Sequence, residues 1–170
     1  AGMLLSRNHL SMAVVGPDVM RVGDRRSLDG FAEGVERSGK PGARWVAVSC
    51  AESPESVRRV VDDLLQREER PDGWLILKRR TFMTVYTYLA SLGIRIGEDI
   101  SLLCRDADLH FSAMVPSAAH YTHDATELNR RLLRMISVLL RGGRPGRTRI
   151  LVQSRFSDGG SLRPADPPRT

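Results

Sequence analysis

The sequence is poor in cysteine and in aromatic residues, and it has no long apolar segment. Cysteine occurs twice among 170 residues, and aromatic residues make up 5%. No run of 18 apolar residues occurs, so the sequence predicts no membrane-spanning helix. No signal peptide precedes the first strand-like segment. Cys50 and Cys104 both lie in or at the end of apolar segments. We therefore expect two reduced core thiols in a cytoplasmic protein, with a disulfide as the alternative.

Catalytic and cofactor motifs are also missing. No serine lies in a Gly-x-Ser-x-Gly elbow, and neither Gly-x-Gly-x-x-Gly after a strand nor a Walker loop occurs. His110, His120 and His123 share one region, but no cysteine or carboxylate completes a metal-binding spacing. The sequence therefore predicts no enzyme, metal or cofactor. A small α/β enzyme or a receiver-like domain stays open as the alternative, although Asp18 stands alone where a receiver has several acids.

The positive charge of the chain is concentrated in one region. The net charge is +6, and residues 121–155 hold eight arginines against Asp124 and Glu127, so the rest of the chain is neutral overall. A basic surface can attract nucleic acid. This region has no interleaved aromatic residues and no recognition-helix motif. We therefore interpret it as solvated helix and loop charge, with an acidic partner surface as the next alternative.

Strand-like and helical segments alternate along the chain. This pattern is typical of a doubly wound α/β fold, flavodoxin-like, with a mostly parallel sheet covered on both faces. The expected long loop is 105–122, and we expect the chain to be loose after Gly159. Expected strands are 12–15, 45–48, 74–77, 100–104 and 150–152. Expected helices are 28–35, a helix starting at Ser53-Pro54-Glu55, one capped by Thr81 and ending at Gly93, and 124–141.

Ligands bind to an open parallel sheet at the carboxyl ends of its strands. The loops that follow the first four expected strands, residues 16–24, 49–53, 78–81 and 105–120, should therefore form one ligand crevice. Asp106 lies two residues after the end of the fourth strand. Its carboxylate can accept two hydrogen bonds from sugar hydroxyls or from purine amines.

Several stretches, taken in order, resemble the lactose/galactose repressor family of bacterial transcriptional regulators. Residues 93–106 are similar to its G-x-x-x-P-x-D-I-S-V-V-G-F/Y-D signature, with Gly97 for Pro, Cys104 for Gly and Arg105 for the aromatic residue. The other similar stretches are 8–16 (G-H-R-x-I-A-x-I-G), 28–31 (R-x-x-G-F), 70–73 (x-P-D-A), and Pro116 with the helix and Gly142-Gly143 (P-x-L-T-T-V … L-L-x-x-I-x-G).

The resemblance covers about residues 4–162 and implies one part of a larger protein. Family members have a helix-turn-helix head and a two-lobed sensor like periplasmic sugar-binding proteins. Residues 1–162 match the second lobe plus helix 124–141, which in the family packs on the first lobe; residues 163–170 form a loose tail. We therefore expect a fragment that contacts DNA only through a head outside this chain. The apolar face of helix 124–141 should then pair with another chain, giving a homodimer.

The resemblance also implies an effector site. Asp106 matches the family's ligand-contacting Asp. Arg26 is the nearest match to its ligand-binding Arg, because Ser27 holds that position. Lys78 and Arg79 stand where the family has Asn-Asp, which suits neutral polyols. The cations suit an anion instead, such as a phosphorylated or acidic sugar, or they mean that ordinary sugar binding has been lost. The expected ligand is thus a sugar-like or anionic small molecule.

Overall fold

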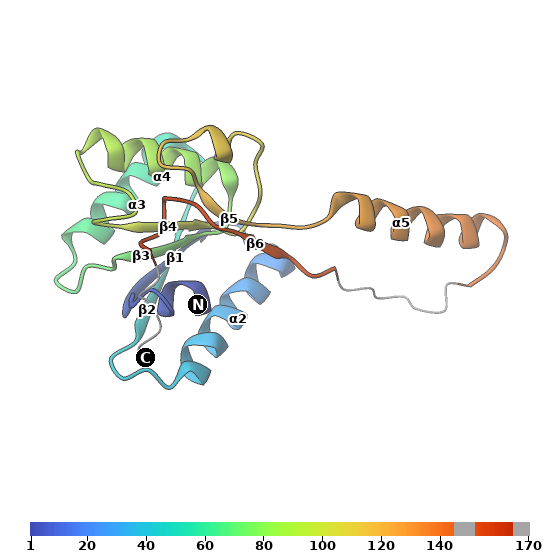
Figure 1. The fold of residues 1–170 in the computed structure, drawn as a ribbon, viewed down its shortest axis with the longest axis horizontal. Helices are drawn as coiled ribbons and strands as arrows, with labels where there is room; N and C mark the ends of the chain where they lie inside the picture. The colour runs from blue at the N-terminus through green and yellow to red at the C-terminus, as the bar shows by residue number, and fades with distance from the viewer. Residues whose placement is uncertain (145–151, 165–170) are drawn as a thin grey trace.

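The computed structural model describes residues 1–144 and 152–164, which build one six-stranded sheet with helices on both faces (Figure 1). The strand order is β2-β1-β3-β4-β5-β6. The first five strands run parallel and β6 is antiparallel to β5, which confirms the predicted mostly parallel sheet. The strands are β1 Ser11–Pro17, β2 Arg44–Cys50, β3 Gly73–Ile76, β4 Ser101–Cys104, β5 Ala119–Thr122 and β6 Arg155–Ser157.

The helices are divided between the two faces of the sheet. In Figure 1, α3 and α4 lie on one side of the strands, and α1 and α2 lie on the other. The short α1 was not predicted, because four residues are too few to show a helical period. The helices are α1 Gly2–Leu5, α2 Val22–Ser38, α3 Pro54–Gln66, α4 Arg79–Ser91 and α5 Ala125–Leu140, with a 3-10 turn at Phe111–Ala113.

Two hydrophobic clusters separate along the strands because successive side chains point to opposite faces. In β1, Ala13 and Val15 belong to the cluster under α3 and α4, whereas Met12 and Val14 belong to the cluster under α1 and α2. Trp74 in β3 is fully buried, and its indole N–H donates to the Pro71 carbonyl at 2.8 Å. A sheet covered on both faces explains why its strands are apolar at consecutive positions. Both cysteines are buried and free, as predicted.

The predicted start of α3 is confirmed, but that of α4 is wrong. Ser53 caps α3 by accepting from the Ser56 N–H at 3.2 Å, with Pro54 in the first turn. In contrast, α4 begins at Arg79 with Lys78 at the N-cap, and Thr81 is buried inside the helix. Only two residues separate β3 from α4, and the helix begins with two arginines. Its apolar periodicity begins later, so the sequence pattern placed the start of the helix too late.

The predicted loop 105–122 is wrong at its end, where β5 forms. Ala119 is the partner of Leu103 in β4, which places β5 next to β4 in the sheet. The strand is short and its side chains are half-buried beyond Ala119, so it lacks the apolar run that marks the other strands. Of the strand predicted at 150–152, Ile150 and Leu151 lie outside the described residues, and Val152 lies in no strand, three residues before β6 begins.

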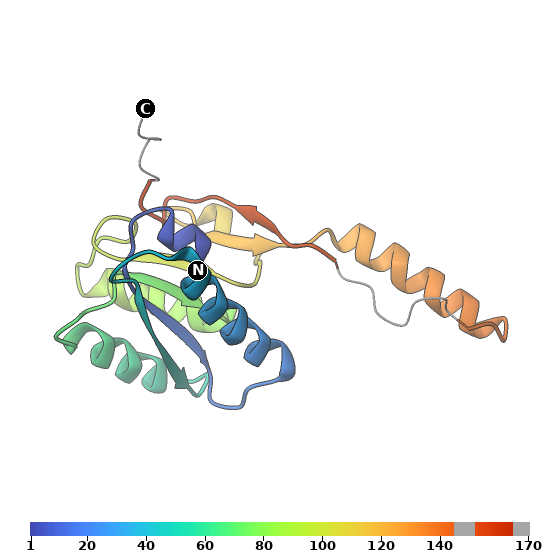
Figure 2. The ribbon, with the colours of Figure 1, turned by 90° about the horizontal axis from the view of Figure 1, so that it is seen from below.

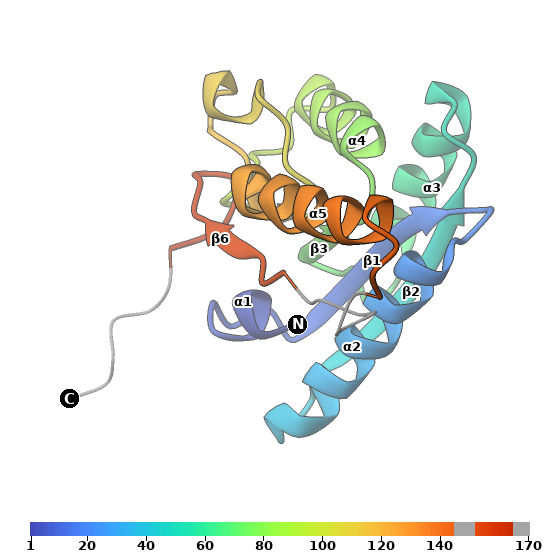
Figure 3. The same ribbon diagram turned by 90° about the vertical axis from the view of Figure 1, so that its right-hand side faces the viewer.

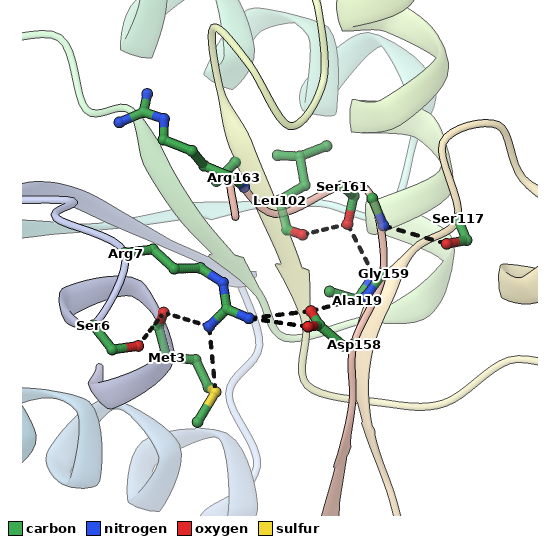
Figure 4. Close-up of polar contacts among 12 residues, drawn as sticks. Met3, Ser6, Arg7, Leu102, Ser117, Ala119, Asp158, Gly159, Ser161 and Arg163 are labelled. Atoms are coloured by element: carbon green, nitrogen blue, oxygen red, sulfur yellow. Dashed lines mark hydrogen bonds and ion pairs between the residues drawn. The ribbon is translucent and has the colours of Figure 1, made fainter. Parts of the chain in front are cut away.

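The segment after β6, residues 158–163, is packed rather than loose as we had expected; we call it the return segment (Figure 4). Ser161 and Leu162 are buried. The Leu102 N–H donates to the Ser161 carbonyl at 2.7 Å, so the return segment continues the hydrogen bonding beside β4. Arg7, after α1, donates to both carboxylate oxygens of Asp158 at 3.1 and 3.2 Å. The return segment was not predicted as packed because its Gly-Gly-Ser sequence has no apolar pattern. Residues 165–170 of the predicted loose tail lie outside the described residues.

Helix α5 leaves the carboxyl edge of the sheet after β5 and extends away from it, and Figures 1 and 2 show it clear of the other helices. Seen end-on in Figure 3, it projects in front of the sheet. None of its side chains is buried. Within 1–144 and 152–164, no helix has both the length and the apolar character needed to cross a membrane. The exposed large apolar residues of α5 are Leu132, Leu133, Ile136, Leu139 and Leu140.

Candidate functional site

A buried carboxylate, Asp24, lies at the carboxyl edge of the sheet, where the loops after β1, β3 and β4 meet. Its side chain is only 2% exposed. Lys78 Nζ approaches the two Asp24 oxygens at 3.0 and 3.1 Å, and Arg105 Nη1 donates to Oδ1 at 2.8 Å. We call these three residues the Asp24 cluster. They join the first turn of α2, the N-cap of α4 and the residue after β4.

The Asp24 cluster keeps its carboxylate ionised. Burial alone would raise the pKa of Asp24, but the hydrogen bonds from Lys78 and Arg105 outweigh it and lower the pKa to about 2. The Arg21 N–H at the start of α2 adds a further hydrogen bond at 3.1 Å. At neutral pH the cluster therefore contains one anion held by two cations.

Arg105 also connects this cluster to Asp106, the candidate taken from the sequence. Arg105 Nε donates to Asp106 Oδ1 at 3.1 Å, and Nη1 donates to the Ser27 hydroxyl at 3.1 Å. Asp106 is 39% exposed, so its carboxylate is held in place yet accessible. A fixed and accessible carboxylate beside a guanidinium can hydrogen-bond a polar small molecule.

Asp106 and Arg105 line a recess of about 390 Å³. We expected this recess to include residues 16–24 and 78–81, and it does not. The first segment contacts residues that line the recess, because Arg105 donates to Asp24 and Ser27 donates to the Gly23 carbonyl. The second connects to it through Lys78, which binds Asp24. The volume lies within the range of small-ligand sites. The other lining residues are Ala1, Ser27, Gly30, Phe31, Leu75, Tyr121, His123 and Ser154.

The remaining predicted residues are placed apart from the recess. Lys78 is half-buried and bound to Asp24. Arg26 is exposed on α2 and does not line the recess. Arg79 is 61% exposed, and its Nε lies 3.7 Å from Asp108. Of the four predicted residues, the structure therefore connects only Asp106 and Lys78, through Arg105 and Asp24.

The sequence reasoning missed Asp24 and Arg105. A signal was present at Arg105, because it replaces the aromatic residue of the resembled signature. Asp24 carries no such signal, since an acid in the first turn of a helix is ordinary. In the described part of the chain, no three His, Cys, Asp or Glu residues gather in a way that could hold a metal ion.

The chain is similar to known proteins in sequence and in fold. Residues 1–162 match the family model described as a periplasmic binding protein-like domain. Solved structures of LacI family transcriptional regulators are similar at 17–20% sequence identity. One from Bifidobacterium animalis subsp. lactis has a TM-score of 0.82 at 18% identity, covering 96% of this chain and 59% of that one.

Two other similar structures are a complex with a sugar and a dimeric repressor. A LacI family regulator from Arthrobacter sp. FB24, in complex with lactose, has a TM-score of 0.79 at 20% identity, with coverage of 95% and 60%. The dimeric Lac repressor with an 11-residue C-terminal deletion has a TM-score of 0.81 at 17% identity, with coverage of 96% and 59%.

The three solved structures match nearly all of this chain, but this chain matches only part of each of them. The chain spans about 60% of the length of these solved structures. No curated protein matches the sequence. The family model covers residues 1–162, which is nearly the whole chain. The chain therefore belongs to the family of periplasmic binding protein-like domains.

Proposed function

We propose that this chain is the effector-binding part of a bacterial transcriptional regulator, and that the recess at Asp106 receives a sugar-like or anionic small molecule. The observation that supports this most directly is the fixed, accessible Asp106 carboxylate in a recess at the carboxyl edge. A regulator of similar fold is in complex with lactose. The protein would act in the cytoplasm and reach DNA only through a helix-turn-helix head outside this chain.

The proposed mechanism needs binding and no bond-making. Asp106 would accept hydrogen bonds from ligand hydroxyls, while Arg105 holds its carboxylate in one orientation. In a two-lobed sensor, a ligand that contacts both lobes favours the closed arrangement by its difference in affinity for the two arrangements. That difference is the coupling free energy that would reach a DNA-binding head.

Replacing Asp106 with asparagine tests the proposed site. Isothermal titration with a panel of neutral and phosphorylated sugars should identify a sugar that binds the wild-type protein. Asp106→Asn should weaken its binding about tenfold or more, because a hydrogen bond to a charged group contributes about 1.5–3 kcal/mol. Asp108→Asn is the matched control, since Asp108 contacts His110 and Arg79 outside the recess. Unchanged affinity in Asp106→Asn, or equal losses in both variants, would contradict the proposal.

We also propose that the chain forms a homodimer through α5. The helix exposes large apolar side chains on one side and has Arg130, Arg134 and Arg141 on the other. Exposed apolar surface of this kind is typical of a surface that binds another protein. A repressor of similar fold is dimeric.

Analytical ultracentrifugation tests the dimer. The wild-type protein should sediment above the monomer mass at micromolar concentration. Leu132→Glu places a charge in the apolar stripe and should return the protein to a monomer. Ser137→Glu adds the same charge at an exposed polar position of α5 and should leave the dimer intact. A wild-type monomer at all micromolar concentrations would rule out this dimer.

A further inference from the structure

We propose that Asp24 is an internal counter-anion that occupies the position of an anionic ligand between Lys78 and Arg105, and so sets the charge selectivity of the site. This inference rests on the proposed effector-binding function and decides between its two ligand classes. It predicts that the enclosed part of the carboxyl edge rejects phosphorylated and acidic ligands, even though its sequence contains Lys78-Arg79-Arg80.

The geometry of the Asp24 cluster is that of a filled anion site. Two cations from different elements converge on one oxygen, with Lys78 Nζ at 3.0 Å and Arg105 Nη1 at 2.8 Å from Asp24 Oδ1. A third donor, the Arg21 N–H, reaches Oδ2 at 3.1 Å. An ammonium, a guanidinium and a backbone N–H at a helix start are the donors with which proteins bind phosphate and carboxylate ligands. Here the carboxylate is the protein's own.

The two partly enclosed cations at this edge are neutralised. Lys78 and Arg105 are 22% and 24% exposed, and their charges are balanced by Asp24 and by Asp106. Asp108 is 16% exposed and adds a further negative charge, so the partly enclosed groups offer no net positive charge to a ligand in the recess. Exposed charges contribute much less. The exposed arginines at this edge are Arg21, Arg25, Arg26, Arg79 and Arg80.

An incoming anion would have to displace Asp24 from its two cations. Because Asp24 is almost fully buried, the displaced carboxylate would stay inside the protein without its partners. It would also lie close to a second anion. An uncharged polyhydroxyl ligand avoids this cost, since it can bind at Asp106 while the Asp24 cluster remains intact.

Asp24→Asn tests the inference with inorganic phosphate as the probe. Asparagine has nearly the same shape but leaves the two cations without a counter-charge. Isothermal titration should detect no saturable phosphate binding to the wild-type protein at millimolar concentration. The variant should bind phosphate at least about tenfold more tightly. Adding Lys78→Met to Asp24→Asn should remove the gain, because one of the two cations is then lost.

Asp18→Asn is the control, because it removes the same charge from an exposed position after β1 and should not create phosphate binding. Saturable phosphate binding by the wild-type protein would overturn the inference, and this result does not depend on whether Asp24→Asn folds. Equal gains in Asp18→Asn and Asp24→Asn would also overturn it, since they would indicate general charge attraction. Failure of neutral sugars to bind would count against the proposed effector function. It would not change what the phosphate titrations say about Asp24.

Discussion

Gly97→Ala is expected to lower the free energy of unfolding by about 2–6 kcal/mol. Gly97 has a φ of +86°, a conformation in which a Cβ is strained. A Cβ at this position would also overlap the carbonyl oxygen of Gly160 in the return segment. Backbone strain of about 1–3 kcal/mol and overpacking of about 1–3 kcal/mol add here. The overlap is with backbone atoms, so no side-chain rotation can relieve it.

Gly39→Ala separates the two contributions. Gly39 also has a positive φ, +59° at the end of α2, but a Cβ there would meet no atom within 4 Å. We expect this control to lose only about 1 kcal/mol, from backbone conformation. Urea unfolding followed by circular dichroism gives both values. Equal losses in the two variants would show that the approach of the return segment to Gly97 has no energetic consequence.

The role of Gly97 shows what the sequence can and cannot predict. The resembled signature identifies Gly97 as a departure from Pro, and a positive φ excludes proline, whose ring fixes φ near −65°. The second reason, the closeness of Gly160, depends on a segment far away in the chain. The first four strands and most helices were predictable because local apolar periodicity records which faces are buried. The return segment was not, because it is fixed by hydrogen bonds.

The same distinction applies to the candidate site. Asp106 could be predicted at this edge because it lies two residues after a buried strand and matches a signature. Lys78 could also be predicted as a charged residue at the carboxyl edge, but its partner could not. The pairing of Lys78 with Asp24, and of both with Arg105, joins three distant loops, and no local pattern specifies it. The sequence therefore locates the edge that we propose binds a ligand but leaves the charge of the site open.

Ser161→Ala is expected to destabilise the protein by about 2–6 kcal/mol, although it removes only one oxygen atom. The Ser161 hydroxyl is fully buried between β4 and β5. It donates to the Leu102 carbonyl at 2.7 Å and accepts from the Ala119 N–H at 2.8 Å (Figure 4). Alanine leaves both backbone groups buried and without this partner, and each such group costs about 1–3 kcal/mol.

Ser117→Ala provides the matched comparison within the same hydrogen-bonded cluster. Ser117 accepts from the Gly160 N–H at 3.2 Å, and this bond is exposed, so water can replace the hydroxyl and the loss should stay below about 1 kcal/mol. Urea unfolding of both variants, with matching slopes, measures the difference. Similar small losses in both would show that β4 and β5 do not depend on the return segment. A large loss confined to Ser161→Ala would instead make one buried hydroxyl the connection that holds β5 to β4 beyond their short ladder, because only Leu103 and Cys104 of β4 have partners in β5.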